Sequence, residues 1–537
     1  PNPPLPKVLW SLRDNNNYEQ TGLLVALNYF ADNDKLFLHN FYLKSRRSIE
    51  KPELSGPAAY VLPADDAHPG AQAQLLRVLQ LQHAEISRVQ TAFAVQVPAP
   101  REKSKDDDKK DDDAAPTQPK TVVHTFAAGS YVVRMDQPYS RIADTLLDRQ
   151  YWAPDDPQKH PYDDTGWTFG ALFDTDVVRV TDKAILGVPM HISSAPVDPA
   201  FDLPGLGIHG KLPRIALMHT WIDTQTEGWW RLALDTLGVK YTYISTQAVA
   251  HEKNLRDRFD VILFAPIGMN DSQMIVNGLP MWGNPLPWKT TSLTPNIGKI
   301  DATDDIRPGL GEQGVANLKR FVAAGGLFVA SDDTAKFAID MGMAPGVFAE
   351  QDKNLKVVGS VLRAEAVDAN NVVTHGYDKP FGVYSASGLS FTLSNLVTGD
   401  NHLPNAKDYK RPTGRGGPHD SDAPEGRAGT PAPELPHVEP WQALRLNIEQ
   451  SRNNPLAIPA NQQPRAVVRF ADADELLISG LLNDEDVLAK RAAVVDARFG
   501  KGHTLLFAIN PFWRGETIGS YALVFNAIMN FDHLDPH

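Results

Sequence analysis

Between residues 211 and 400, short apolar runs alternate with amphipathic segments of helical period. The run Phe259–Ala265 (FDVILFA) is nearly continuous, as is typical of a central parallel strand buried on both faces. Glu227–Gly238 and Val315–Ala324 carry apolar residues at helical spacing, and glycine closes each segment. Strands that alternate with helices predict right-handed crossovers, so we expect a doubly wound parallel α/β sheet. The remaining expected strands are Arg214–Met218, Tyr241–Ile244 and Leu327–Ala330.

This larger unit is expected to extend over residues 211–537. Two Pro/Gly-rich stretches, near 276–311 and 400–439, interrupt the pattern and predict long insertions. From Arg465 onward the chain is rich in β-forming residues, and a helical pattern follows over Thr517–Met529. We expect this last part of the chain to complete the same unit.

Residues 57–210 predict a smaller α/β unit. Its strands are expected at Ala58–Leu62, Ile86–Val89 and Gly129–Met135, with a helix at Ala71–His83 after the first strand. The stretch 98–120 contains KSKDDDKKDDDAAPTQPK, which is polar and of low complexity. Such a sequence buries too little apolar surface to order itself, so we expect a disordered insertion there.

Residues 1–56 predict a helical connector. Leu23, Leu24, Leu27 and Phe30 recur near helical spacing. Basic residues gather near the end of the pattern, which suits a helix C-terminus. We expect one or two helices that pack against something else.

Composition narrows the class of protein. The chain has 537 residues, a net charge of −13 and no cysteine. The absence of cysteine removes disulfides, cysteine–zinc sites, iron–sulfur clusters and thiol nucleophiles. The acidic balance argues against nucleic-acid binding, and no apolar run is long enough to span a membrane.

A search for catalytic motifs finds none that is complete. His251-Glu252 lacks the second histidine of a zinc-protease helix, and His437-Val438-Glu439 has the wrong offset. Ser331 follows an expected strand, where an α/β sheet presents a nucleophile, but its context lacks the glycines of a nucleophile elbow. The competing interpretation is that Ser331 or Asp332 caps the next helix. No metal site and no catalytic residue are therefore predicted in this chain.

One group of polar and aromatic residues remains as a candidate binding site. In doubly wound sheets, ligands bind outside the carboxyl ends of the strands. The alternative is that the tryptophans are packing residues and that the carboxylates favour the positive end of a helix. The candidate residues follow two expected strands and are His219, Trp221, Asp223 and Glu227 after the first, and Ser331 and Asp332 after the second.

Several segments resemble the region after the catalytic domain in large bacterial zinc carboxypeptidases of the carboxypeptidase A-like family. They include NNNYEQTGLLVALNYFADNDKLFLHNFYLKSRRSIEK, PYDDTGWTF, ALMHTWIDTQTEGWWRLALDTLGVKYTYI and AAVVDARFGKGHTLLFAINPFWRGETIGSYALVFNAI. The resemblance implies that zinc and its ligands belong to an upstream domain absent from this chain. It also implies that the larger unit is flavodoxin-like, in the manner of class I glutamine amidotransferases. In those enzymes a cysteine follows a central strand, where this chain has Ala330-Ser331-Asp332, and His375 here lacks their histidine–glutamate pattern.

Two functions follow as expectations. The first is a non-catalytic accessory region of a zinc-carboxypeptidase-like hydrolase, which positions a peptide or other small substrate or mediates assembly, in an exported bacterial protein. The second is an independent module that binds carbohydrate or peptide at the strand ends, because tryptophan faces suit sugars and cations. A serine hydrolase built on Ser331 is the weakest alternative. Self-association into a homo-oligomer stays open.

Overall fold

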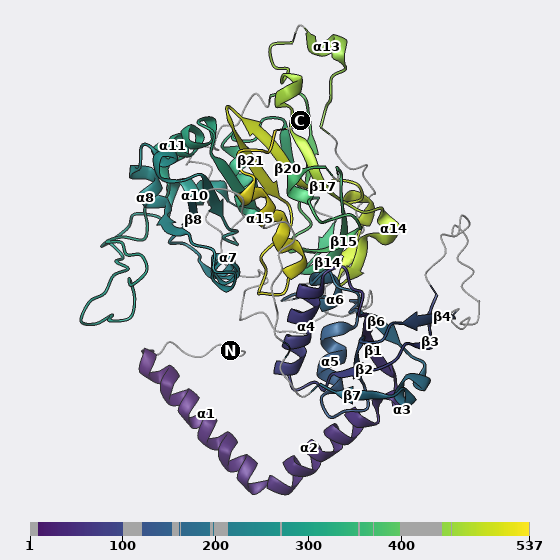
Figure 1. Cartoon of the computed structure of the whole chain (residues 1–537). Coiled ribbons are helices and arrows are strands. Elements are labelled where there is room, and N and C mark those ends of the chain that lie inside the picture. Colours follow the sequence, from purple (N-terminus) through teal and green to yellow (C-terminus); the bar gives the residue numbers. More distant parts are fainter. Residues whose placement is uncertain are drawn as a thin grey trace.

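The computed structural model describes residues 9–99, 121–152, 161, 163–193, 197, 213–268, 271–352, 355–368, 370–397, 443–452 and 454–535 (Figure 1). The insertions predicted at 98–120 and 400–439 lie almost entirely outside these residues. Of the described helices, none combines the length and apolar character that a membrane crossing requires.

The larger unit contains five parallel strands that confirm the predicted doubly wound α/β fold. Along the sheet they run in the order β21-β11-β10-β8-β9. Numbered by their place in the chain, this is the flavodoxin-like order 2-1-3-4-5 read from the other end. The strands are β8 (Ile215–His219), β9 (Thr242–Ser245), β10 (Val261–Phe264), β11 (Leu327–Ser331) and β21 (Gly502–Phe507).

Helices cover both faces of these strands because alternate side chains point to opposite sides. Leu217, Leu263 and Val329 belong to one apolar core, which α7 (Gln225–Thr236) and α15 (Tyr521–Met529) close. Met218 and Phe264, on the other face, belong to a second core. That core is closed by α8 (Thr246–His251), α9 (Leu255–Arg258), α11 (Gly311–Ala323) and α12 (Asp333–Asp340).

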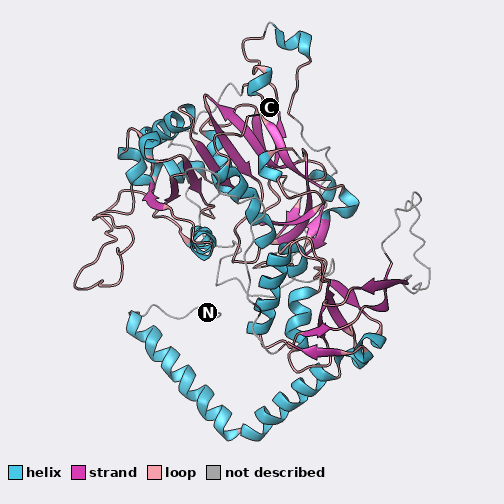
Figure 2. Cartoon of the chain, in the orientation of Figure 1, coloured by secondary structure: helices cyan, strands magenta, loops and turns pink. Residues whose placement is uncertain are grey.

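Four antiparallel strands continue the sheet beyond β21, so the sheet is mixed rather than purely parallel (Figure 2). Three short strands that pair off this path bring the sheet to twelve strands. The last part of the chain supplies three strands to this sheet path, as predicted for the region after Arg465. The added path strands are β20 (Ala492–Phe499), β17 (Arg465–Phe470), β14 (Ser360–Ala366) and β15 (Phe381–Ser385). Shorter elements of the unit are α10 (Ser272–Asn277), β12 (Val347–Glu350), β13 (Lys356–Val357), β16 (Ser390–Leu393), α13 (Ile448–Arg452), α14 (Ala473–Leu476), β18 (Leu477–Ser479) and β19 (Leu482–Asn483).

The smaller unit is an antiparallel sheet in the order β6-β1-β5-β2-β7 with helices on one side. Its strands are β1 (Ala59–Leu62), β2 (Ser87–Val89), β5 (Tyr131–Arg134), β6 (Val178–Val180) and β7 (Met190–Ile192), and β3 (Phe93–Pro98) pairs with β4 (Thr121–Phe126). Its helices are α4 (Pro69–Leu81), α5 (Ser140–Leu147) and α6 (Phe169–Leu172). Tyr60 and Leu76 of this unit belong to the same apolar core as Leu217 of the larger unit, so the two units pack directly on each other.

Helices α1 (Leu12–Asp32) and α2 (Asp34–Ile49) form a V that stands away from both units (Figure 1). No residue of α1 is buried, and Ser48 is the one buried residue of α2. Leu24 and Phe41 are 65% and 68% exposed. The expectation that these helices pack on something else is therefore not met within the described residues, although α3 (Lys51–Leu54) does join the smaller unit.

Candidate functional site

The end of β8 lies at the switch point of the sheet. In a flavodoxin-like order the chain leaves the first and third strands in opposite directions, which opens a crevice between their carboxyl ends. Here these strands are β8 and β10. His219 is the last residue of β8, and the loop that follows carries Trp221 and Asp223. The Oδ2 atom of Asp223 would lie 3.8 Å from a Cβ added to Gly268, after β10, so the loops that follow β8 and β10 approach each other here.

A chain of ring and carboxylate contacts links His219 to α7. The His219 ring stacks on Tyr243 of β9, with centroids 4.0 Å apart, and meets the edge of Trp221 at 4.9 Å. The Tyr243 hydroxyl donates to Oε2 of Glu227 at 2.9 Å. The structure therefore brings three of the predicted residues, His219, Trp221 and Glu227, into one network through Tyr243, which sequence analysis did not single out.

The predicted insertion near 276–311 contributes to this network. Asp301 Oδ2 lies 2.9 Å from Nε2 of His219, and Nδ1 of the same ring lies 3.0 Å from the carbonyl of Thr220. Burial lowers the pKa of His219, against the opposing effect of Asp301. Both ring nitrogens thus face oxygen acceptors, and only the protonated ring donates to both.

Several polar atoms at the end of β8 and on α7 are buried without a hydrogen-bond partner. Among the described residues these include the indole Nε1 of Trp221 and of Trp229, and Oε1 of Glu227. The nearest cation to Glu227 is Arg231, whose Nε lies 3.8 Å from Oε1. Burial raises the pKa of Glu227 to about 7. Unpaired buried polar atoms are rare in native proteins because each one has lost its hydrogen bonds to water, so such a group calls for an explanation.

The end of β11 is arranged differently. Ser331 is fully buried, and its hydroxyl donates to the carbonyl of Ile509 at 2.7 Å. Its N–H donates to Oγ1 of Thr334, which in turn donates to the carbonyl of Phe264 at 2.8 Å. Ser331 therefore ties β11 to the segment after β21 and does not present its hydroxyl to a crevice.

Asp332, rather than Ser331, occupies the strained turn between β11 and α12. Its backbone has φ 53° and ψ −119°, a conformation that side chains with a Cβ rarely adopt. Its carboxylate makes no hydrogen bond that caps α12, and Ser387 Oγ donates to it at 3.1 Å. Asp332 occupies the N-cap position of α12, as the alternative interpretation expects, and its carbonyl accepts from the N–H groups of Ala335 and Lys336. The side chain does not supply the capping hydrogen bond, because it is turned toward Ser387.

The six predicted residues thus fall into two sets. Asp223 belongs with the β8 set, although its Oδ1 also accepts from the N–H of Gln225 and so supports the predicted helix-start role. Trp230 is fully buried and donates to Asn510, as the packing alternative expects. No hydrogen bond or ion pair within the described part of the chain joins Ser331 or Asp332 to the β8 set, since β10 lies between them.

One polar cluster escaped the sequence analysis. Asp164, before α6, accepts from the Tyr384 hydroxyl at 2.6 Å and from the Trp513 indole at 2.9 Å. Arg514 pairs with both Asp163 and Asp164. Burial raises the pKa of Asp164 in spite of these donors. Asp164 lies in the segment PYDDTGWTF, and Trp513 and Arg514 lie in the segment NPFWRGET, some 350 residues further along the chain. A contact between residues so far apart leaves no local pattern in a single sequence.

No group of three or more His, Asp or Glu side chains suited to a metal ion occurs among the residues that the structure describes.

Comparisons with known proteins give weak similarities. No protein-family model and no curated protein sequence matches the chain. Among solved structures, PurLQS from Thermotoga maritima is 10% identical over 60% of this chain and 99% of its own, with a TM-score of 0.32. A β-galactosidase from Rahnella sp. R3 is 12% identical over 59% of this chain and 31% of its own, with a TM-score of 0.28. At TM-scores this low, the fold assignment rests on the strand order itself.

Proposed function

We propose that this chain is a binding region and not a catalytic one: a non-catalytic accessory region of a zinc-carboxypeptidase-like hydrolase, which binds a peptide or carbohydrate at the end of β8. The observation that carries the binding proposal is the set of buried, unpaired polar atoms beside the switch point. Trp221 Nε1 is a donor and Glu227 Oε1 is an acceptor, and neither has a hydrogen-bond partner. A ligand with hydroxyl or amide groups supplies both kinds of partner.

The ring geometry supports the same proposal. Trp221, His219 and Tyr243 place aromatic surface at the switch point, where ligand sites of this fold class occur. Aromatic rings with one polar edge bind sugars and peptides through apolar contact and a directed hydrogen bond. An independent binding module would use the same residues. It would differ from an accessory region only in the absence of an attached catalytic domain.

The arrangement of Ser331 supports a non-catalytic role for the larger unit. A nucleophilic serine needs a general base within hydrogen-bond reach and an accessible hydroxyl. The hydroxyl of Ser331 is buried and donates to a backbone carbonyl. A fluorophosphonate probe is expected to leave Ser331 unlabelled, and labelling at this residue would contradict the proposal.

The accessory context rests on the sequence resemblance and on the V of α1 and α2. Helix α1 is apolar around much of its surface from Leu23 to Phe30, and a helix of that kind is normally buried. An upstream catalytic domain would cover it, and zinc would belong to that domain. The amidotransferase-like identity of the larger unit is part of the same proposal, with Asp332 at the turn where those enzymes carry cysteine.

Two measurements test the proposal. Saturation-transfer NMR with a panel of soluble oligosaccharides and tripeptides is expected to identify at least one ligand, whose signal weakens in Trp221→Phe and persists in Trp282→Phe, a matched change at an exposed indole. A panel without a single binder would contradict the binding role. Elemental analysis of the purified chain is expected to find no tightly held zinc, and one zinc per chain would contradict the non-catalytic assignment.

A further inference from the structure

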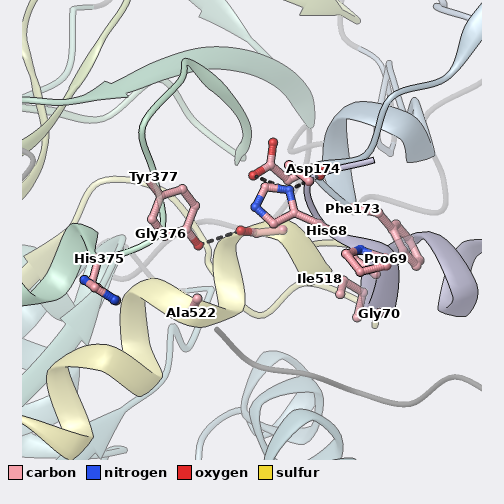
Figure 3. Close-up of a pocket in the computed structure, with 13 residues that line it drawn as sticks. His68, Pro69, Gly70, Phe173, Asp174, His375, Gly376, Tyr377, Ile518 and Ala522 are labelled. Atoms are coloured by element: carbon pink, nitrogen blue, oxygen red, sulfur yellow. Dashed lines mark hydrogen bonds and ion pairs between the residues drawn. The ribbon is translucent and has the colours of Figure 1, made fainter. Parts of the chain in front are cut away.

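A cavity of about 330 Å³ lies between the smaller and the larger unit, and its lining includes none of the β8 site residues (Figure 3). The start of α4 and the segment after α6 form one wall, with His68, Phe173 and Asp174. The other wall is formed by Tyr377, by Ile518 in the turn before α15, and by Ala522 in the first turn of α15. Ligand sites are common at the junction of two units, and this volume is at the lower end of their usual range.

The walls of this cavity are held in place by close contacts around it. A Cβ on Gly519 would lie 2.6 Å from Cβ of Asp174, so the two units approach as closely as a glycine allows. The Tyr377 hydroxyl donates to the carbonyl of Gly519 at 2.6 Å. Phe173 and Ile518 belong to the apolar core that both units share. At Gly519 and Asp174, therefore, the two walls already approach as closely as they can.

The lining is mostly apolar and has one polar corner. His68 Nδ1 lies 2.7 Å from the backbone carbonyl of Asp174 and 3.6 Å from its carboxylate (Figure 3). When the His68 ring is neutral, Nδ1–H donates to the carbonyl and Nε2 is left as an acceptor. Across the described residues, the structure gives the Asp174 carboxylate no hydrogen-bond donor, and His68 is its one recorded ion-pair partner.

The charge at this corner is negative and incompletely balanced. Burial raises the pKa of Asp174 to about 6, and Asp66, Asp176 and Asp378 raise it further, while His68 lowers it. The ionised form of Asp174 therefore has little compensating charge around it. A partly buried carboxylate of this kind is stabilised by a cation that donates hydrogen bonds to it.

We propose that this cavity binds a small organic amine, with its apolar body between Phe173 and Ala522 and its ammonium group between the Asp174 carboxylate and Nε2 of His68. The ammonium group supplies donors to two acceptors that share one corner. The first turn of α4 also faces the cavity and would favour an anion, but the surrounding carboxylates oppose one. The chemistry therefore selects an amine over a carboxylate of the same shape. This site is separate from the β8 site, so either proposal can fail alone.

The test uses the full chain and three probes of one shape: phenethylamine, 2-phenylethanol and phenylacetate. Titration followed by NMR or calorimetry is expected to show saturable binding of phenethylamine, weaker binding of the alcohol and none of phenylacetate. Asp174→Asn removes the charge at a residue with φ 54°, a conformation that asparagine tolerates. It is expected to weaken amine binding at least tenfold. Asp176→Asn removes a neighbouring charge outside the lining and is expected to change binding less than threefold.

A second variant tests the position of the ligand. Ala522→Phe fills the cavity from α15 and is expected to abolish amine binding, with the fold verified by circular dichroism and by urea unfolding. Three results would each overturn the proposal: equal amine affinity in Asp174→Asn, tighter binding of phenylacetate than of phenethylamine, or no saturable amine binding up to ~10 mM, which corresponds to a negligible affinity.

Discussion

The ends of β8 and β11 lie on the same edge of one sheet with only β10 between them, and they are built in opposite ways. At β11, the Ser331 hydroxyl, the Ser331 N–H and the Thr334 hydroxyl all have partners within the protein. At β8, Trp221 and Glu227 each bury a polar atom without a hydrogen-bond partner. The difference separates a strand end whose hydrogen bonds are complete from one where buried polar atoms lack hydrogen-bond partners.

The two strand ends also carry two different free-energy costs: backbone strain at the end of β11 and a buried charge at the end of β8. The strained turn at Asp332 is held by bonds on either side of it, through Ser387 and through the contact of its N–H with Phe507. The cost at β8 is electrostatic, since the Glu227 carboxylate is almost fully buried and the nearest cation, Arg231, lies 3.8 Å from Oε1. Substitutions distinguish the two because backbone strain does not depend on pH, whereas the charge on Glu227 does.

The largest expected effect is on the pH dependence of stability at Glu227. Its folded pKa of about 7 lies above the ordinary glutamate pKa of 4.5, so the unfolded chain loses this proton first and stability falls as pH rises from about 4.5 to about 7. The difference corresponds to about 3 kcal/mol. Glu227→Gln is expected to remove this pH-dependent part of the free energy of unfolding. The stability of the variant relative to the parent is therefore expected to rise by about 3 kcal/mol between pH 4.5 and pH 8. Urea unfolding at several pH values measures it.

Glu312→Gln is the control for that experiment, because Glu312 is exposed in the first turn of α11. It is expected to leave the pH profile of the parent unchanged. If Glu227→Gln shows the same profile as Glu312→Gln, the buried charge at β8 does not carry the cost assigned to it.

The next effect concerns the framework at β11. Thr334→Val keeps the shape of the side chain but leaves the Ser331 N–H and the Phe264 carbonyl without this partner. We expect a loss of about 2 kcal/mol in the free energy of unfolding, with ligand binding at β8 unchanged. Thr242→Val, at an exposed position of β9, is the matched control and is expected to stay within about 0.5 kcal/mol of the parent. If Thr334→Val and Thr242→Val are equally stable, the hydrogen bonds at the end of β11 do not form the stabilising framework described above.

A smaller effect is expected from the backbone strain at Asp332. Asp332→Gly and Asp332→Ala both lose the bond from Ser387, but glycine adopts φ 53° at little cost. The glycine variant is expected to be more stable than the alanine variant by about 1 kcal/mol, measured from the urea midpoint of each. An alanine variant that equals or exceeds the glycine variant would show that the turn stores no strain.

Much of the fold could be predicted from local patterns in the sequence. Strands β8, β10 and β11 begin and end within two residues of the predicted runs, because fully buried parallel strands are continuous apolar segments. The antiparallel extension of the sheet was not anticipated, since pairing partners far apart in the chain leave no periodic signal. The same reason hides the contact of Asp301 with His219 and that of Asp164 with Trp513.

The candidate site was predicted in part. The residues after β8 could be named because they directly follow a strand, and strand ends bind ligands in this fold class. Ser331 and Asp332 were chosen by the same rule, and sequence could not distinguish them from the β8 set. The distinction depends on hydrogen bonds to Ile509 and Ser387, which come from segments after β21 and β15.

The central claim is that the end of β8 binds a ligand and the end of β11 supports it. The most direct test is the affinity of the best ligand from the oligosaccharide and tripeptide panel for the parent, for Trp221→Phe and for Ser331→Ala. We expect Trp221→Phe, which loses one indole N–H, to weaken binding about tenfold, and Ser331→Ala to stay within about twofold of the parent. Unchanged affinity in Trp221→Phe, or a tenfold loss in a folded Ser331→Ala protein, would contradict the account.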